Sequence, residues 1–198
     1  MSDFGEFEKI KHILKANIEN INNDGTGLVM LFLGFCNHLV YYMDAYKVLF
    51  NSRNYYVCKT MERAVIDLFI KARCLLMAQN TEEFARKLID TGKISKNDLQ
   101  PETIKDVSTT RLCEYFDAAD RSTIDPIMGG PLTRRFRDCC KYVHPNMPCI
   151  WSYTTDKQNN WQTIIEDDKE EFISIAYRVN TILSLLVRKI HELQVENS

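Results

Sequence analysis

The residue types best suited to chemistry gather in one short stretch, residues 131–145, with the sequence PLTRRFRDCCKYVHP. This stretch carries Arg137, then Asp138, and His144 follows seven positions after the arginine. Seven residues of an α-helix turn through about 700°, so Arg137 and His144 would share a face to within about 20° and lie about 10.5 Å apart along the axis. A long arginine that leans toward the histidine could share one phosphate-sized ligand with it, or meet it across a dimer axis.

His144 combines two features of an acid–base residue. It precedes Pro145, which steers it out of helical dihedrals, so it would lie at the C-terminal end of a helix. The exposed carbonyl groups at such an end favour a protonated imidazole, and an imidazole with a reference pKa of about 6.5 can act as acid or base near neutral pH. The alternative is structural: His144 caps the helix, and Arg137 pairs with a nearby acid.

An arginine, a polar residue, a short spacer and a histidine near a helix end resemble the signature of the HEPN superfamily, with Arg137, Asp138 and His144 at the matching positions. The segment 54–76 and the phrase YVHP at 142–145 also resemble uncharacterised bacterial helical proteins. The HEPN resemblance implies a helical bundle, often dimeric, found in toxins, defence systems and RNA-processing proteins. Active members are metal-independent ribonucleases in which the 2′-hydroxyl of the RNA attacks the phosphate. By this resemblance His144 would handle protons, Arg137 would stabilise charge on the phosphorane, and Asp138 would orient one of them.

The same stretch is a candidate RNA-binding surface. The formal net charge of the chain is -2, so binding to a polyanion would need a local basic patch. Aromatic side chains beside such a patch can stack on bases. The alternative is a solvated helix face with core aromatics nearby. The candidate basic residues are Arg134, Arg135, Arg137 and Lys141, and the candidate aromatic residues are Tyr142, Trp151 and Tyr153.

The seven cysteines lack the regular spacing of a disulfide scaffold, which indicates a reducing compartment and predicts a cytoplasmic protein. Cys140, His144 and Cys149 could supply three zinc ligands, with Cys139 adjacent. Their spacing matches no strong zinc pattern and no fourth ligand is evident, so we predict neither metal nor cofactor. A Cys140–His144 nucleophile pair would lack an oxyanion hole.

Hydrophobic periodicity predicts an all-α fold for residues 1–198: one domain, a bundle of about six or seven helices. The second, third and last helices would form its core. Glu62 and Arg63 flank one core stripe and could make a partly buried pair. The predicted site combines the helix over 131–144 with the loop over 145–165. The other helices are expected over 6–22, 28–50, 52–78 with Ser52 as its cap, from Thr81 to a stop at Gly92, from Pro101 in a first turn, and over 167–193.

Residues 28–50 form the most apolar segment of the chain. Asn37, His38, Asp44 and Lys47 within it would be costly in a bilayer, so a core helix is expected here and no membrane partner. A self-association face is the alternative. The N-terminus has no basic region followed by an apolar run, and no signal peptide is expected.

Two functions stay open at this point. The first is a HEPN-like protein with metal-independent endoribonuclease activity in a bacterial toxin or defence system, with RNA as its partner. The second is a non-catalytic helical module for interaction or dimerisation, or a regulator, with a second copy or another protein as partner. The local basic patch favours the first function, and the slightly negative net charge favours the second.

Overall fold

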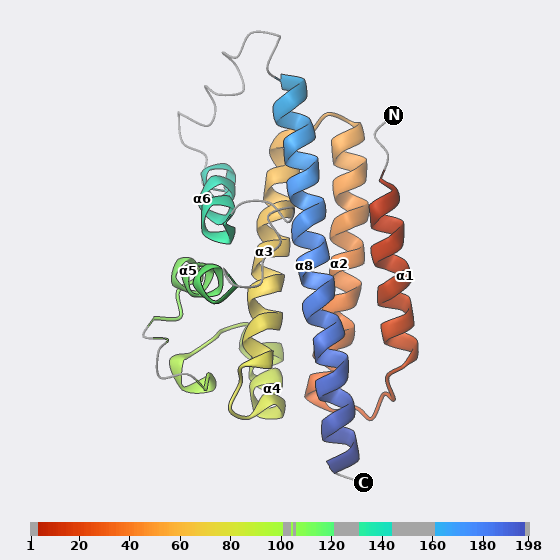
Figure 1. Ribbon diagram of the computed structural model, residues 1–198, viewed down its shortest axis with the longest axis vertical. Coiled ribbons are helices and arrows are strands. Elements are labelled where there is room, and N and C mark those ends of the chain that lie inside the picture. Colours follow the sequence, from red (N-terminus) through yellow and green to blue (C-terminus); the bar gives the residue numbers. More distant parts are fainter. Residues whose placement is uncertain (1–3, 101–103, 105, 121–130, 144–160, 197–198) are drawn as a thin grey trace.

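Four long helices lie side by side along the structure: α1 (Gly5–Glu19), α2 (Gly27–Asn51), α3 (Tyr55–Leu76) and α8 (Trp161–Glu196) (Figure 1). The computed structural model describes the chain except residues 1–3, 101–103, 105, 121–130, 144–160 and 197–198. α3 packs along α8 and α2, and α1 packs against α2 and α8. The second, third and last predicted helices therefore meet at the centre of the bundle.

Shorter helices cover this bundle. α4 (Thr81–Thr91) packs on α2, whereas α5 (Thr109–Asp120) and α6 (Leu132–Val143) pack on each other and on α3, on the side away from α1 (Figure 1). A 3-10 turn, η1 (Lys96–Asp98), lies between α4 and α5. The described part of the chain contains seven α-helices and no strand, only an isolated bridge between Ala78 and Leu99. The predicted all-α bundle is confirmed.

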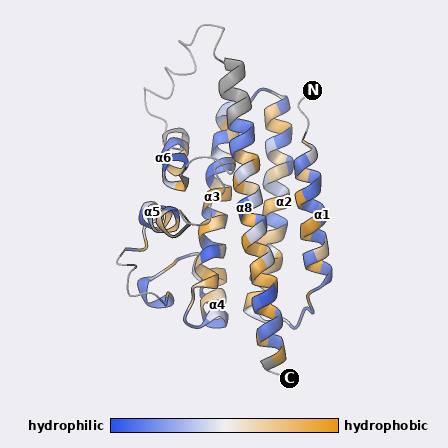
Figure 2. Cartoon of the chain, in the orientation of Figure 1, coloured by the Kyte–Doolittle hydropathy of each residue, from blue (hydrophilic) through white to orange (hydrophobic). Residues whose placement is uncertain are grey.

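Aromatic rings join three of the long helices in the core. Tyr46 of α2 stacks on Phe172 of α8, with ring centroids 3.9 Å apart, and Phe7 of α1 contacts both rings. Aromatic pairs of this kind contribute about 0.5–1.5 kcal/mol beyond the burial of their area. Figure 2 shows apolar residues recurring along α2, α3 and α8, whereas hydrophilic residues are more frequent on α1 and α6.

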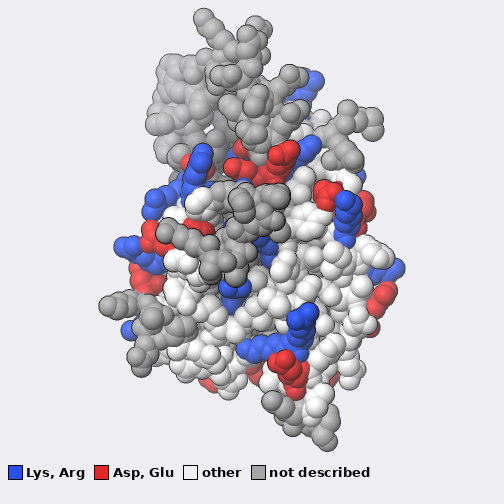
Figure 3. Space-filling model, in the orientation of Figure 1, with Lys and Arg blue, Asp and Glu red and all other residues white. Residues whose placement is uncertain are grey.

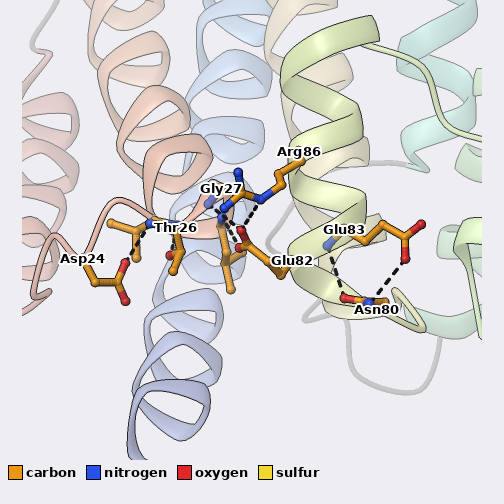
Figure 4. A network of polar contacts seen from close by, with 9 residues as sticks. Asp24, Thr26, Gly27, Asn80, Glu82, Glu83 and Arg86 are labelled. Carbon is orange, nitrogen blue, oxygen red and sulfur yellow. Dashed lines mark hydrogen bonds and ion pairs between the residues drawn. The ribbon is translucent and has the colours of Figure 1, made fainter. Parts of the chain in front are cut away.

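The start of α2 and the end of α4 each have a clear structural cause. Thr26 caps α2, and Glu82 of α4 accepts hydrogen bonds from the backbone N–H groups of Gly27 and Leu28, at 2.8 and 2.9 Å (Figure 4). These are the first N–H groups of the helix, which have no partner within it. α4 ends at Gly92, whose φ of 66° is the left-handed conformation that glycine adopts readily, and the predicted stop is confirmed.

Three predicted boundaries are wrong. Ser52 ends α2, where its hydroxyl donates to two carbonyl groups of the last turn, and Asn54 caps α3 in its place. α5 begins at Thr109, and the described residues from Ile104 to that point are not helical. α8 begins at Trp161, so residues 161–165 belong to a helix and not to the predicted loop.

α2 is long and apolar enough to cross a membrane by length and composition alone. Its inner face includes Phe32, Cys36 and Leu39, which are fully buried in the bundle. Core helices pass the same test of length and composition. The outer side of α2 exposes Met30, Tyr41 and Val48.

Candidate functional site

Helix α6 carries most of the predicted site, and α5 fixes its N-terminal end. The buried carboxylate of Asp117 accepts hydrogen bonds from the backbone N–H groups of Leu132 and Thr133, at 2.7 and 2.9 Å, and from the hydroxyl of Thr133. These N–H groups have no partner within the helix, and a negative charge there complements the helix dipole. Asp117 therefore sets where α6 begins and holds it against α5.

α6 packs on α3, and its inner face carries Leu132, Phe136 and Cys139, which are all buried. The guanidinium carbon of Arg63 in α3 lies 3.6 Å from the centroid of the Phe136 ring, a close cation–π contact. Arg63 also contacts the sulfur of Cys140 at 2.8 Å. Arg63 thus attaches α6 to α3 through both an aromatic ring and a thiol.

Arg63 and Glu62 do not pair with each other, contrary to the prediction. Arg63 pairs with Asp67, one turn further along α3, with Nε 3.1 Å from the carboxylate. Glu62 instead accepts a hydrogen bond from Lys59 at 2.9 Å. Neighbours in a helix sequence point about 100° apart, so Glu62 faces the core and Arg63 faces α6.

Arg135 was predicted to contact RNA, but the structure places its side chain in the interior. Only 4% of the residue is exposed, and its guanidinium donates to the backbone carbonyl of Glu171 in α8 at 2.7 Å. Its Nε atom has no hydrogen-bond partner among the described residues. We therefore exclude Arg135 from the candidate RNA-binding surface and assign it to the packing of α6 on α8.

Arg135 lies next to a buried cluster of charges around Lys59. The ammonium of Lys59 lies 2.9 Å from Glu62, 2.7 Å from Asp168 and 3.6 Å from Glu171. Burial alone would lower the pKa of Lys59, but the carboxylates of Glu62 and Asp168 outweigh burial and raise it. The ammonium therefore stays charged and ties α3 to the N-terminal half of α8.

For the acidic groups of this region, burial disfavours the negatively charged form and so acts to raise the pKa. Burial raises the pKa of Glu62, although the nearby Lys59 counteracts it. The pKa of the Cys139 thiol is also raised, by burial and by the adjacent Glu62. Cys139 is therefore a protonated, buried thiol, which suits packing and not nucleophilic attack.

The outer face of α6 presents Arg134 and Arg137, with 79% and 62% of their side chains exposed. Nη2 of Arg137 lies 3.0 Å from Glu114 of α5, which also pairs with Arg111 at 2.6 Å. Arg134 lies 3.9 Å from Asp138, one turn along α6. Figure 3 shows basic and acidic groups side by side at the edge of the molecule where α5 and α6 lie. Arg137 is thus accessible, and an acid fixes its position.

The structure brings together Arg134, Arg137 and Asp138 on one outward face of α6. The backbone of α6 continues to Val143, but the side chains of Lys141 and Tyr142 lie outside the described residues. The other predicted site residues also lie outside the described residues, namely His144, Trp151 and Tyr153. The predicted proximity of Arg137 and His144 therefore stays a prediction.

The candidate zinc ligands are described only in part. Cys140 is half-buried and contacts Arg63, whereas His144 and Cys149 lie outside the described residues. Among the residues that the structure describes, no three His, Cys, Asp or Glu side chains are arranged to hold a metal ion. The six described cysteines are all free thiols.

Glu114, Asp117 and Arg63 shape the site, and sequence reasoning assigned none of them to it. The structural alternative for Arg137 predicted an acidic partner but did not identify it. Glu114 and Asp117 lie three residues apart on α5, and that spacing puts two acids on one helix face. Which helix faces them is a matter of tertiary packing, so the spacing alone could not connect them to α6.

The chain matches no protein-family model, no curated protein and no solved structure. A functional assignment therefore has to come from the chemistry of the residues described above. The outward face of α6 offers two exposed guanidinium groups beside two carboxylates, which is suited to binding an anionic backbone by exchange of ion-pair partners.

Proposed function

We propose that the outward face of α6, formed by Arg134, Arg137, Asp138 and the position of Lys141, binds the phosphate backbone of RNA. We further propose that Arg137 and His144 give the chain HEPN-like, metal-independent endoribonuclease activity in a cytoplasmic bacterial toxin or defence system. One observation carries the proposal: the guanidinium of Arg137 is exposed and positioned by Glu114, on a helix that ends at the residue before His144.

The proposed reaction needs no metal ion because the nucleophile is part of the substrate. His144 takes the proton of a ribose 2′-hydroxyl, and the oxygen attacks the adjacent phosphorus. Arg137 stabilises the added negative charge of the phosphorane. The bond to the 5′-oxygen then breaks, and that oxygen receives a proton from the imidazolium. The products are a 2′,3′-cyclic phosphate and a 5′-hydroxyl, so the protons balance.

Glu114 does not prevent such binding. An exposed ion pair is worth about 0.2–1 kcal/mol, because solvent screens it and two side chains must be held in place. A phosphate can accept two parallel hydrogen bonds from one guanidinium, which is a stronger contact. Arg137 can therefore exchange Glu114 for a phosphate.

The test is cleavage of a labelled single-stranded RNA by the purified protein in the presence of EDTA. We expect the wild-type chain to cleave, and Arg137→Gln and His144→Ala to lose activity. Arg86→Gln on α4 is the matched control, because Arg86 is equally exposed, at 63%, and is also paired with an acid, Glu82 at 2.7 Å. Loss of cleavage on adding EDTA, or full activity in Arg137→Gln, would contradict the proposal.

A second function is favoured by a different observation. The carboxylates of Glu114 and Asp138 offset the charge of the two exposed arginines of α6, and the surface of α2 is unusually apolar. Both features suit a non-catalytic module that binds another protein chain. In that case the purified protein would leave RNA intact, and all the α6 variants would behave alike.

A further inference from the structure

One ammonium is shared by three carboxylates in the buried cluster around Lys59. Its Nζ atom lies nearest to Asp168, at 2.7 Å, then to Glu62 at 2.9 Å and to Glu171 at 3.6 Å. A single positive charge cannot neutralise three negative charges, and an unneutralised charge is costly away from water. The carboxylate that water reaches least therefore bears most of this cost.

Glu62 is that carboxylate. Its side chain is 1% exposed, whereas those of Asp168 and Glu171 are 22% and 35% exposed and can be screened by solvent. One oxygen of Glu62, Oε2, accepts a hydrogen bond from Lys59, but the other, Oε1, has no hydrogen-bond partner among the described residues. An ionised carboxylate has acceptor sites on both oxygens, and a protonated carboxyl is neutral. These surroundings favour the protonated form.

Every helix around Glu62 supplies polar groups to this region. They are Lys59 of α3, Asp168 and Glu171 of α8, Arg135 and Cys139 of α6, and Tyr46 of α2. Arg135 does not supply the missing counter-charge as an ion pair, because its guanidinium donates to a backbone carbonyl. The buried acid of α5, Asp117, is bound to the start of α6.

Tyr46 can accept the hydrogen bond of a protonated Glu62. Its hydroxyl is buried and, like Oε1 of Glu62, has no hydrogen-bond partner among the described residues. Burial raises the pKa of Tyr46, and the nearby thiol of Cys58 and the carboxylate of Glu62 raise it further, so the hydroxyl itself stays neutral. A hydroxyl oxygen has two acceptor positions besides its own proton.

We infer that Glu62 binds a proton in the folded chain at neutral pH, and that losing this proton in alkaline solution weakens the packing of α6 on α3. Arg135 and Cys139, both buried, bring α6 against Glu62. α6 is the helix that can yield, because it has 12 residues and lies at one side, whereas α3 and α8 lie at the centre of the bundle (Figure 1). The inference does not depend on the proposed ribonuclease activity, and the two can fail separately.

The direction of the pH effect follows from the state that holds the proton more strongly. Burial raises the pKa of Glu62 above its ordinary value of 4.5, and Lys59 offsets only part of this rise. The folded state therefore binds the proton more strongly than the unfolded state. The stability that this proton contributes is fully present below pH 4.5 and is lost as pH rises through the raised value. Within that window the unfolding equilibrium constant rises up to about 10-fold per pH unit.

The first test compares urea unfolding of the wild type and Glu62→Gln from about pH 5 to about pH 9, since glutamine has the shape of the protonated side chain but cannot ionise. We expect the unfolding constant of the wild type, relative to that of Glu62→Gln, to rise at least about 10-fold over this range, the effect of one pKa unit. Glu170→Gln is the matched control, because Glu170 is a neighbouring but exposed acid of α8 and should follow the wild type.

Two results of this test would overturn the inference. The ratio of the two unfolding constants could stay the same at every pH, or Glu62→Gln could lose stability relative to the wild type as pH rises. Either result would mean that Glu62 is ionised in the folded chain and that its charge stabilises Lys59.

Infrared difference spectra at pH 7 detect the proton directly. A protonated carboxyl absorbs at a higher frequency than a carboxylate, so the difference between the wild type and Glu62→Gln should contain the carbonyl band of a protonated carboxyl. The difference between the wild type and Glu170→Gln should contain carboxylate bands alone. Carboxylate bands alone in both difference spectra would overturn the assignment of the proton to Glu62.

The loosening of α6 is tested by alkylation of Cys139, located by mass spectrometry of the peptides. Wild type and Glu62→Gln are compared at the same pH, so that the direct effect of pH on thiols cancels. We expect equal rates in weak acid and faster labelling of the wild type in alkaline solution. Cys74 of α3, which is fully buried, should stay protected in both. Equal labelling of Cys139 in both chains at alkaline pH, or labelling of Cys74 together with Cys139, would overturn a local loosening of α6.

Discussion

At the scale of single residues, Arg137 is held by one acid whose removal has a predictable effect. Glu114→Gln removes the ion pair at 3.0 Å and leaves the guanidinium free for phosphate. An exposed pair is worth about 0.2–1 kcal/mol, so RNA binding should tighten about 1.4- to 5-fold. Fluorescence anisotropy with a labelled RNA measures the change, using the His144→Ala background so that the RNA stays intact.

The charge change itself needs a control, because Glu114→Gln makes the whole chain less negative. Glu19→Gln makes the same change on α1, where Glu19 is 65% exposed and lies 3.8 Å from Lys15. It should leave RNA binding within error of the wild type. Weaker RNA binding by Glu114→Gln would contradict the prediction and would mean that the acid orients Arg137 productively. An equal increase in RNA affinity in Glu114→Gln and Glu19→Gln would mean that only net charge matters.

Arg135 shows what the local sequence could and could not predict. The stretch RRFR contains three arginines that look alike in composition, and only the helical positions of Leu132, Phe136 and Cys139 reveal which of them faces inward. Arg135 lies next to Cys139 on that wheel, so the signal was present in the periodicity. Its acceptor, the carbonyl of Glu171, could not be found that way, because it comes from a helix 36 residues away.

At the scale of the helices, periodicity predicted the long elements because each buries a continuous apolar stripe. Helix ends were harder to predict where the decisive contact comes from another helix, as with Asp117 of α5 at the start of α6. Asn54, by contrast, caps its own helix and could have been identified from the local sequence. A cap within the same helix can thus be predicted from the sequence. A cap that another helix supplies is evident only from the structure.

Glu82 is such a cap from another helix, and it makes the stability of α2 depend on pH. Removing its carboxylate in Glu82→Ala leaves the N–H groups of Gly27 and Leu28 without their acceptor (Figure 4). The loss of a helix cap costs about 0.5–2 kcal/mol. We expect the free energy of unfolding from urea titrations at pH 7 to fall by that amount, whereas Glu83→Ala should cost less, because Asn80 remains as the cap of α4.

The sign of the pH effect follows from the pKa of Glu82. Burial opposes ionisation, but the hydrogen bonds from Leu28 and Gly27 outweigh it, so the pKa lies below its ordinary value of 4.5. The folded state therefore holds the carboxylate more strongly than the unfolded state, and the stabilisation is present above pH 4.5 and lost as pH falls through the lower value. The difference in the free energy of unfolding between the wild type and Glu82→Ala should become smaller in acid. A difference that grows there would contradict the role of the charge.

At the scale of the whole molecule, the surfaces on α2 and α6 lie on different sides of α3. The non-catalytic function would use the apolar surface of α2 and the ribonuclease would use α6, so a change at His144 should affect only the ribonuclease. Induced expression tests this directly in growing cells. We expect the wild type to slow growth, and His144→Ala to allow normal growth because the acid–base group is lost.

The comparison separates the two proposed roles, provided that immunoblots show equal levels of the variants. Equal growth of the wild type and His144→Ala would count against a toxic ribonuclease and would favour the non-catalytic module.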